Sequence, residues 1–368
     1  MKYLFFTMLL TVAFTGIVAA QECSTNLLLQ KTGVWKEAKK GSQGGTAAEL
    51  QKEKKNIATI HTMIKSKYTP TGVEANYHGA YNPFYANMAG NSYYYSIIPL
   101  NYYCDGNTIK TAHETGSYFQ IAANIFDSEI YDTAQGDRLL MEGFNVMYDL
   151  PVLKDGHWFF KEINVPLGMG ITGKRTMWLI TYDGKLPYSY VSRKEFLEKR
   201  IKALTVQKEM AAVGFKDVLK NIETEKSFKE KEFKNDPVKM NHYMKMDYLQ
   251  IKARYEKLLA ENNSKFAPAF TKIANQLRMS DDELSLPATV KDDPNDHLSY
   301  LFTNDDDPFG KNLIKPNPAY FNKKLPKSAP QFFMVYVRAD DKEPIAAKFM
   351  ADVIKAVDFS LLKNMLGK

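Results

Sequence analysis

The sequence predicts an α+β fold: an antiparallel sheet with covering helices and a long antiparallel helical hairpin insertion. Three observations predict this fold class. Short aromatic segments separated by turn residues occupy positions 75–190, as expected for antiparallel strands. Two long segments with apolar residues at helical spacing follow at 192–263. A strand-like apolar segment and two helical patterns occupy 331–368, and we expect them to complete the sheet across the hairpin.

The first twenty residues are predicted to be a signal peptide. Lys2 supplies a positive charge, the segment from Leu4 to Val18 is almost wholly apolar, and Val18 and Ala20 are the small side chains that a signal peptidase requires. We expect cleavage between Ala20 and Gln21, which makes the mature protein secreted or periplasmic. No later apolar segment of the sequence is long enough for a membrane span, so none is expected in the mature chain.

Cys23 and Cys104 are the only cysteines of the chain. An even number of cysteines in an oxidising compartment indicates a disulfide, which would fasten the mature N-terminus to the end of a tyrosine-rich strand. The alternative is that Cys104 is a nucleophile with His113 as its base. The surrounding sequence does not favour this alternative, because no basic residue flanks the thiol to promote the thiolate.

An amphipathic helix is predicted at about 46–66. Thr46 and Glu49 have the spacing of a capping box, and apolar residues follow at helical intervals. The composition then changes to Tyr, Phe, Ile and Asn with turn residues. This change predicts two or three strands between 75 and 126, of which Ser117–Phe126 is the clearest.

Two Asp-Gly dipeptides predict β-hairpins. Asp155-Gly156 and Asp183-Gly184 each lie between two apolar segments. Asp-Gly tolerates the positive φ angles of a type I′ turn, whose twist matches that of the strands it joins. The two dipeptides together therefore indicate an antiparallel sheet.

A change of pattern after residue 191 predicts two long helices. Ser192 and Glu195 have capping-box spacing, and a stripe of alternating four- and three-residue intervals follows, interrupted only by Lys208: Leu197, Ile201, Leu204, Ala211, Phe215, Val218 and Ile222. Asp236 and Pro237 begin a second stripe of Met244, Tyr248, Ile251, Tyr255 and Leu258. The short Asn-Asp-Pro break predicts that the two helices pack as an antiparallel pair.

The chain after the helices returns to loops and then to regular structure. Gln331–Val337 is predicted to be a buried strand, Pro344 to begin a helix that ends at Val357, and Asp358 to cap a last short helix. We therefore expect five segments: a signal peptide at 1–20, an α+β sheet domain at 21–190, a helical hairpin region at 191–280, a loop-rich Asp/Pro segment at 281–330, and a C-terminal strand with helices at 331–368 that completes the sheet domain.

A tyrosine-rich strand is the first candidate for a binding site. Five tyrosines lie between Asn91 and Gly106, and strand alternation places Tyr93 and Tyr95 on one face and Tyr94 on the other. A row of rings can stack on a sugar or an aromatic ligand. Ordinary packing is the preferred interpretation, because strands favour Tyr in any case. The ligand-binding hypothesis comprises Tyr93, Tyr94, Tyr95, Tyr102 and Tyr103.

An acidic segment at 292–310 is the candidate for a metal site. It contains six aspartates and two asparagines, which are oxygen ligands that suit Ca²⁺. Asp305 and Asp307 are the candidate ligands. The EF-hand register fails, however, because Pro316 occupies the twelfth position counted from Asp305. Turn-forming aspartates are therefore the preferred interpretation, and no cofactor is expected.

Sequence motifs of known catalysts are weak or missing. Gly168–Thr176 contains G-x-G-x-x-G, but a strand rather than a helix follows it, so we interpret it as a loop between strands. The six histidines do not occur in H-E-x-x-H spacing, and no serine lies in G-x-S-x-G. Lysines and acidic residues alternate along the chain without clustering by sign, which argues against a nucleic-acid partner.

These observations favour an exported, non-enzymatic binding or envelope-associated scaffold protein with a protein or glycan partner. The alternative is a secreted hydrolase that acts on glycans or peptides, with acidic residues that converge only in the fold. Geometry distinguishes the two functions. A concave pocket with converging carboxylates or histidines favours the enzyme, whereas an exposed apolar surface favours the scaffold.

Overall fold

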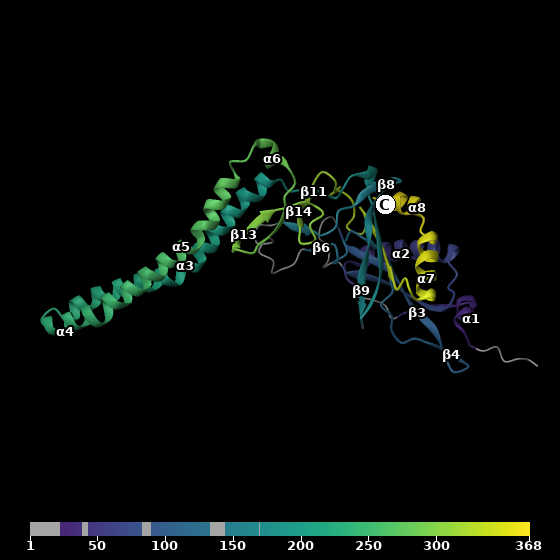
Figure 1. Cartoon of the computed structure of the whole chain (residues 1–368), viewed down its shortest axis with the longest axis horizontal. Coiled ribbons are helices and arrows are strands. Elements are labelled where there is room, and N and C mark those ends of the chain that lie inside the picture. The colour runs from purple at the N-terminus through teal and green to yellow at the C-terminus, as the bar shows by residue number, and fades with distance from the viewer. Residues whose placement is uncertain (1–22, 39–42, 83–89, 133–143, 169) are drawn as a thin grey trace, which may run out of the picture.

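The computed structural model describes residues 23–38, 43–82, 90–132, 144–168 and 170–368. The predicted signal peptide and its cleavage site lie outside the described residues. The structure is mixed α+β, with two sheets in which most strand pairs are antiparallel (Figure 1). Its helices are α1 (Thr25–Gln30), α2 (Ala47–Lys67), α3 (Arg193–Glu232), α4 (Pro237–Tyr243), α5 (Leu249–Gln276), α6 (Asp281–Ser285), α7 (Pro344–Ala356) and α8 (Phe359–Met365).

The larger sheet forms the body of the protein. Its strands lie in the order β1 (Val34–Glu37), β2 (Val73–Asn82), β3 (Ser92–Asp105), β5 (Tyr118–Ala123), β15 (Phe333–Ala339), β10 (Ile171–Ile180), β9 (His157–Gly168) and β8 (Val152–Lys154), with β4 (Thr108–Thr111) paired to β3. Strands β1 and β2 are parallel, contrary to the expectation of a wholly antiparallel sheet. The reason is that α2 connects them, and a helical crossover returns the chain in its original direction.

The smaller sheet joins segments that are far apart in the sequence. Its strands lie in the order β13 (Asp296–Phe302), β12 (Thr289–Asp293), β14 (Lys311–Pro316), β7 (Asn145–Met147) and β6 (Tyr131–Asp132), and β11 (Tyr188–Tyr190) pairs with β14. Strands β12, β13 and β14 contain much of the segment that the sequence indicated to be loop-rich. The frequent Asp and Asn residues at its turns indicated loops, so the short strands between these turns were not predicted.

The strand β15 lies in the middle of the larger sheet, between β5 and β10. It begins at Phe333, two residues after the predicted start. Its side chains alternate between two cores: Phe333, Val335 and Val337 pack under helices α2, α7 and α8, whereas Met334 and Tyr336 pack on the other face. Figure 1 shows these three helices together on one side of the sheet. Both faces of the sheet are therefore covered, which explains why β15 is continuously apolar.

One of the two predicted Asp-Gly hairpins is confirmed and the other is wrong. Asp155 and Gly156 have φ angles of 51° and 81° and join β8 to β9, as predicted. Asp183 and Gly184 also have positive φ angles, but they form a short 3₁₀ turn at Tyr182–Gly184. The chain then enters the smaller sheet as β11, because both edges of β10 are already paired with β9 and β15.

The two long predicted helices exist as α3 and as α4 and α5, which a π-helical turn at Met244–Tyr248 joins. Asn262 Nδ2 on α5 lies 3.3 Å from the Lys208 carbonyl oxygen on α3, and Lys252 Nζ lies 2.7 Å from Glu223 Oε1. Residue numbers thus rise along one helix as they fall along the other. Figure 1 shows the helices side by side, extending away from the two sheets, and we call them the arm (residues 193–276).

The arm is anchored to the smaller sheet at its base. Leu197 and Leu204 of α3 and Phe266 and Ile273 of α5 are buried against residues of β12, β13 and β14. The buried Arg200 guanidinium donates a hydrogen bond from Nη2 to the Leu298 carbonyl oxygen at 2.7 Å. Helix α5 continues to Gln276, past the predicted end at 263 and through Pro268, which removes one backbone hydrogen bond from the helix.

Candidate functional site

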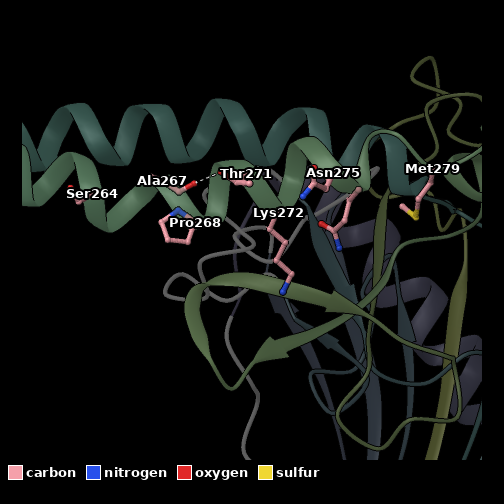
Figure 2. Close-up of a pocket in the computed structure, with 8 residues that line it drawn as sticks. Ser264, Ala267, Pro268, Thr271, Lys272, Asn275 and Met279 are labelled. Atoms are coloured by element: carbon pink, nitrogen blue, oxygen red, sulfur yellow. Dashed lines mark hydrogen bonds between the residues drawn. The ribbon is translucent and has the colours of Figure 1, made fainter.

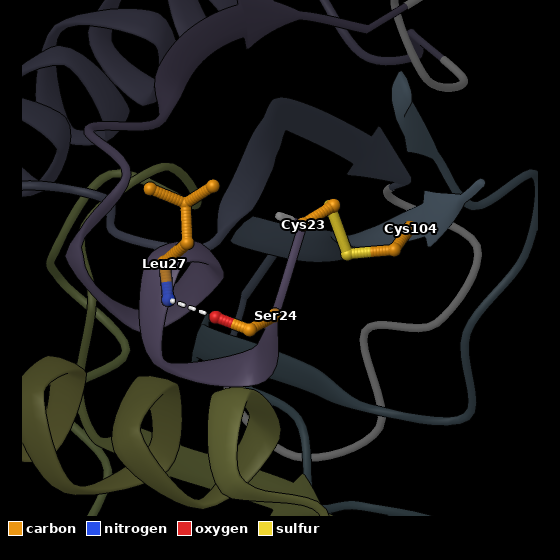
Figure 3. Close-up of a disulfide and its surroundings, with 4 residues drawn as sticks. All are labelled: Cys23, Ser24, Leu27 and Cys104. Carbon is orange, nitrogen blue, oxygen red and sulfur yellow. Dashed lines mark hydrogen bonds between the residues drawn. A yellow bond between two sulfur atoms is a disulfide. The ribbon is translucent and has the colours of Figure 1, made fainter. Parts of the chain in front are cut away.

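The predicted disulfide is present. Cys23 and Cys104 are bonded, and their Cα atoms are 5.7 Å apart across 81 positions of sequence (Figure 3). The bond holds helix α1 against β3. Ser24 caps this helix by accepting a hydrogen bond from the Leu27 amide. Both cysteines are thereby consumed, so the alternative of Cys104 as a nucleophile beside His113 is wrong.

The five candidate tyrosines do not form one surface. Tyr93 and Tyr95 are fully buried beneath α2, where Asn56 Nδ2 donates to the Tyr93 hydroxyl at 2.7 Å and His61 Nδ1 lies 3.0 Å from the Tyr95 hydroxyl. Burial raises the pKa of both hydroxyls far above their usual range. Both rings are part of the core, and Tyr95 also lines a cavity of about 300 Å³ on the α2 side of the sheet, together with Glu37, His61 and His78.

The other three tyrosines occupy different surroundings. Tyr102 packs in a small cluster with Leu28 and Ile345 beside the disulfide, and Tyr103 is exposed. Tyr94 points to the opposite face of the sheet from its neighbours and lines a cavity there. The predicted alternation of the strand is therefore correct, and Tyr94 is the candidate that reaches a cavity on this face.

Asp305 and Asp307 are occupied by hydrogen bonds within the protein. Asp307 accepts from Lys291 Nζ at 2.7 Å, from the Thr303 hydroxyl at 2.6 Å and from the Phe309 amide at 2.9 Å. These donors, Lys291 foremost, lower the pKa of Asp307 to about 2. Asp305 accepts from the Thr289 hydroxyl. No group of three or more His, Cys, Asp or Glu side chains suited to a metal ion occurs among the described residues.

A cavity of about 450 Å³ lies on the sheet face opposite α2. Its floor consists of side chains in register on three neighbouring strands: Tyr94 of β3 is paired with Ala122 of β5, which is paired with Met334 of β15, and Gln120 is paired with Tyr336 in the next row. The segment that follows β5 forms the wall. The residues that line the cavity are Tyr94, Gln120, Ala122, Ile125, Phe126, Asp127, Ser128, Tyr131, Met334 and Tyr336.

Among the described residues, Asp127 is the carboxylate that lines this cavity. Its Oδ1 accepts a hydrogen bond from the Glu129 amide at 2.8 Å. Burial is the main cause that raises the pKa of Asp127 above its usual range. Among the described residues no ion pair to Asp127 lies within 4 Å, because the nearby arginines have other partners.

Two arginines beside the cavity are held by two other carboxylates. Arg175 is 3% exposed and contacts Asp149 through Nη2 at 2.6 Å and Glu129 through Nη1 at 3.3 Å. Arg338 contacts Glu129 at 3.0 Å. Together with Asp127 these groups carry three negative and two positive formal charges. Lys161 adds a positive charge near Asp149. Asp127 is the member of this group that lines the cavity.

This cluster of charged residues could hardly be recognised in the sequence. Its members lie on β10, on β15 and in the segments after β5 and β7, so that only the fold brings them together. Arg175 stood in a segment predicted to be an inter-strand loop, but β9 ends at Gly168 and β10 begins at Ile171. The one local signal is the acidic Asp127-Ser128-Glu129 directly after a clear strand.

The arm carries the net positive charge of the protein. Residues 193–276 contain nineteen Lys and Arg and twelve Asp and Glu, a formal net charge of +7, whereas the rest of the chain contains thirty of each. The predicted absence of clustering by sign is therefore wrong at this scale. The two signs alternate locally on the helices, which conceals an excess that appears only when the whole arm is counted.

The arm also exposes large apolar side chains. Val206, Met210, Val213 and Phe228 of α3 are each more than half exposed, with Met210 at 66%. At 100° per residue these four positions fall within about 60° of the helix circumference. They lie on the side opposite the buried Leu204 and Ile222. We call them the outer stripe of α3.

Two open grooves lie on the arm. One of about 890 Å³ follows a single side of α5 near Pro268 and Lys272 (Figure 2). The Lys272 ammonium is bound to Asp293 of β12. The other, of about 660 Å³, lies at the tip between the end of α3 and α4 and includes Phe233 and His242.

Comparisons of the chain with protein families, curated proteins and solved structures find no match. Across the part of the chain that the structure describes, no helix combines the length and the apolar character required to cross a bilayer. Function is therefore inferred from two features of the structure: the charged arm with its outer stripe, and the cavity at Asp127.

Proposed function

We propose that the protein is an exported, non-enzymatic binding scaffold, and that its arm is an inserted helical hairpin that docks an acidic partner protein. The observation that carries the proposal is the outer stripe of α3 on the arm that holds the whole net charge. Grouped exposed apolar side chains on a protein surface are typical of interaction sites. Val206, Met210 and Val213 form such a group, and Phe228 lies about four turns further along the same side of α3. The stripe lies away from the contact with α5, so the arm does not need it for its own packing.

The charge of the arm specifies the partner. Lys202 and Lys220 fall beside the outer stripe on the helical projection of α3, whereas Lys216 is already paired with Glu209. A partner surface with apolar side chains flanked by Asp or Glu would bury the stripe and neutralise these lysines. Such complementarity accelerates association and disfavours basic competitors. The phosphates of a nucleic acid would neutralise the lysines of the arm, but they would not bury the apolar side chains of the outer stripe.

Export is supported by the disulfide. Disulfides persist in oxidising compartments and are rare in the cytosol, so the Cys23–Cys104 bond is compatible with an extracellular location. The predicted signal peptide agrees with this location. A position in the periplasm or at the cell envelope would bring the arm to partners on a neighbouring surface.

The hydrolase alternative has less support. Hydrolysis of glycosides commonly requires two carboxyl groups that both reach the substrate. At the cavity Asp127 is one such group, but Glu129 and Asp149 are engaged by Arg175 and Arg338. A glycan platform of tyrosines is also disfavoured, because Tyr93 and Tyr95 are buried.

Site-specific photo-crosslinking in the exporting cell tests the proposal. A benzophenone amino acid replaces Met210 of the outer stripe in one variant and Glu256, an exposed residue of α5, in the matched control. We expect one discrete protein adduct from position 210 that is lost when Val206→Ser and Val213→Ser are added. The captured partner protein, once identified and purified on its own, should bind the wild-type protein more weakly as the salt concentration is raised.

Three results would contradict the proposal. The first is the same set of adducts from positions 210 and 256. The second is an adduct with a second copy of this chain rather than another protein. The third is binding of the purified protein to anionic lipid vesicles that is stronger than its binding to the captured protein.

A further inference from the structure

We infer that the cavity at Asp127 binds a small organic cation, such as an alkylated ammonium compound. This inference goes beyond the proposed function of the arm and does not depend on it, because the cavity belongs to the body of the protein. It rests on the size of the cavity, on the aromatic side chains that line it and on the Asp127 carboxylate, which forms no ion pair with a described residue.

The cavity has the size of a small-molecule site. Pockets for small ligands are commonly about 300–1,000 Å³ and are lined mostly by apolar groups with a few placed polar ones. The present cavity of about 450 Å³ has this composition, with Gln120, Asp127 and Ser128 as its polar groups apart from the tyrosine hydroxyls. Tyr94, Gln120 and Asp127 are half-buried, so they offer surface to an entering ligand.

Four aromatic residues are among the described residues that line the cavity. Tyr94 and Tyr336 belong to the larger sheet, Phe126 to the segment after β5, and Tyr131 to β6 of the smaller sheet. The face of an aromatic ring attracts a cation, and alkylated ammonium groups are bound in this way by aromatic cages. The protein already uses this interaction nearby, since the Arg338 guanidinium lies 4.5 Å from the centre of the Tyr118 ring, which stacks on Tyr336.

The charge at the cavity favours a cation over a neutral or anionic ligand. The positive charges of Arg175 and Arg338 are turned to Glu129 and Asp149, at 2.6 to 3.3 Å. Asp127 faces the cavity, and its one hydrogen bond from a described donor is to Oδ1. Asp127 forms no ion pair with a described residue, and Arg175 and Arg338 offset its charge only in part. Burial of such a carboxylate is unfavourable. A bound ammonium group would remove this cost, and the rings would cover the alkyl groups.

Calorimetric titration with choline and with 3,3-dimethyl-1-butanol tests the inference. The two molecules have nearly the same shape, but only choline is charged. We expect choline to bind and the neutral alcohol to bind at least tenfold more weakly. Asp127→Asn should weaken choline at least tenfold and leave the alcohol unchanged, because the amide oxygen still accepts the Glu129 amide.

Two further variants locate the binding. Tyr94→Leu removes a ring from the cavity and should weaken choline, whereas Tyr103→Leu removes an exposed ring of the same strand outside it and should not. Equal affinity for choline and the alcohol would overturn the inference of a cation site. So would the absence of choline binding at millimolar concentration, or an unchanged affinity in a folded Asp127→Asn protein. None of these results would bear on the arm.

Discussion

Arg175 Nη2 lies 2.6 Å from Asp149 Oδ2, in an ion pair that joins β10 to the segment after β7. Arg175 is almost completely buried, and the adjacent residue Lys174 points to the other face of the sheet, where it pairs with Glu162 at 3.0 Å in solvent. The two neighbours therefore form a buried and an exposed ion pair on the same strand.

Arg175→Met should destabilise the protein by about 3 kcal/mol or more, because removal of one partner leaves a carboxylate partly buried without a counter-charge. Lys174→Met should change stability little, since exposed pairs contribute little. Denaturant unfolding of both variants measures the difference. The loss in Arg175→Met should shrink in acid, because burial already raises the pKa of Asp149 and protonation removes the unpaired charge. Equal losses in the two variants would contradict this account.

Asp127→Asn should make the unliganded protein more stable at neutral pH. Burial, with a smaller contribution from Glu129, raises the pKa of Asp127, and Arg175 and Arg338 lower it only in part. The carboxyl group thus favours folding below its unfolded pKa, and this contribution is lost as pH rises through the folded pKa. The Asn side chain does not ionise, so the variant does not lose stability in this way. Its melting temperature should equal that of the wild type in strong acid and exceed it increasingly as pH rises. An advantage that is independent of pH would exclude this origin.

Removal of the disulfide should destabilise the fold without changing the arm. The bond closes a loop across 81 positions, and the chain-entropy model gives a contribution of roughly 3–5 kcal/mol for a loop of this length. Unfolding of the Cys23→Ser, Cys104→Ser double variant, compared with the oxidised protein, measures it. Unchanged stability would show that the reduced chain is held at this position by packing alone.

The tip of the arm should open more readily than the centre of the larger sheet. Residues 225–240 lie where only two helices contact each other, whereas residues 331–337 include β15, which is hydrogen-bonded on both sides. Hydrogen exchange followed by mass spectrometry should show faster exchange at 225–240. Equal protection of the two segments would argue against an arm that opens independently.

Calcium should have little effect on the melting temperature. The Asp307 carboxylate already accepts three hydrogen bonds, one of them from the Lys291 ammonium, which a cation would have to displace. Thermal unfolding with Ca²⁺ and with a chelator tests this expectation. A large upward shift with Ca²⁺ that disappears in Asp305→Asn, Asp307→Asn would instead support a metal site.

Features that depend on neighbouring residues could be predicted from the sequence. The capping box of Thr46 and Glu49 is present at the start of α2, and the Asp155-Gly156 turn has the expected backbone angles. The disulfide followed from the number of cysteines and the expected compartment. The prediction of a hairpin at Asp183-Gly184 was wrong because β9 and β15 already occupy both edges of β10. Strand β15 lies more than 140 positions further along the chain, so its pairing could not be read from the local sequence.

The candidate sites were less predictable for the same reason. Asp127, Arg175 and Arg338 come together through β-sheet pairing that no local pattern reveals. The alternation of Tyr93 and Tyr94 was correct, but the sequence could not show that α2 covers the first ring and a cavity adjoins the second. The charge of the arm was present in the sequence and required only a count over 193–276.

The affinity of the purified acidic partner for three forms of the protein tests the central claim most directly. Titration calorimetry would compare the wild type, the stripe variant Val206→Ser, Val213→Ser, and a control variant, Val152→Ser, Leu153→Ser, which removes two equally exposed apolar residues from β8 on the body. We predict at least tenfold weaker binding for the stripe variant alone, and weaker wild-type binding at higher salt. Equal affinity of all three proteins would contradict the claim that the arm binds the partner.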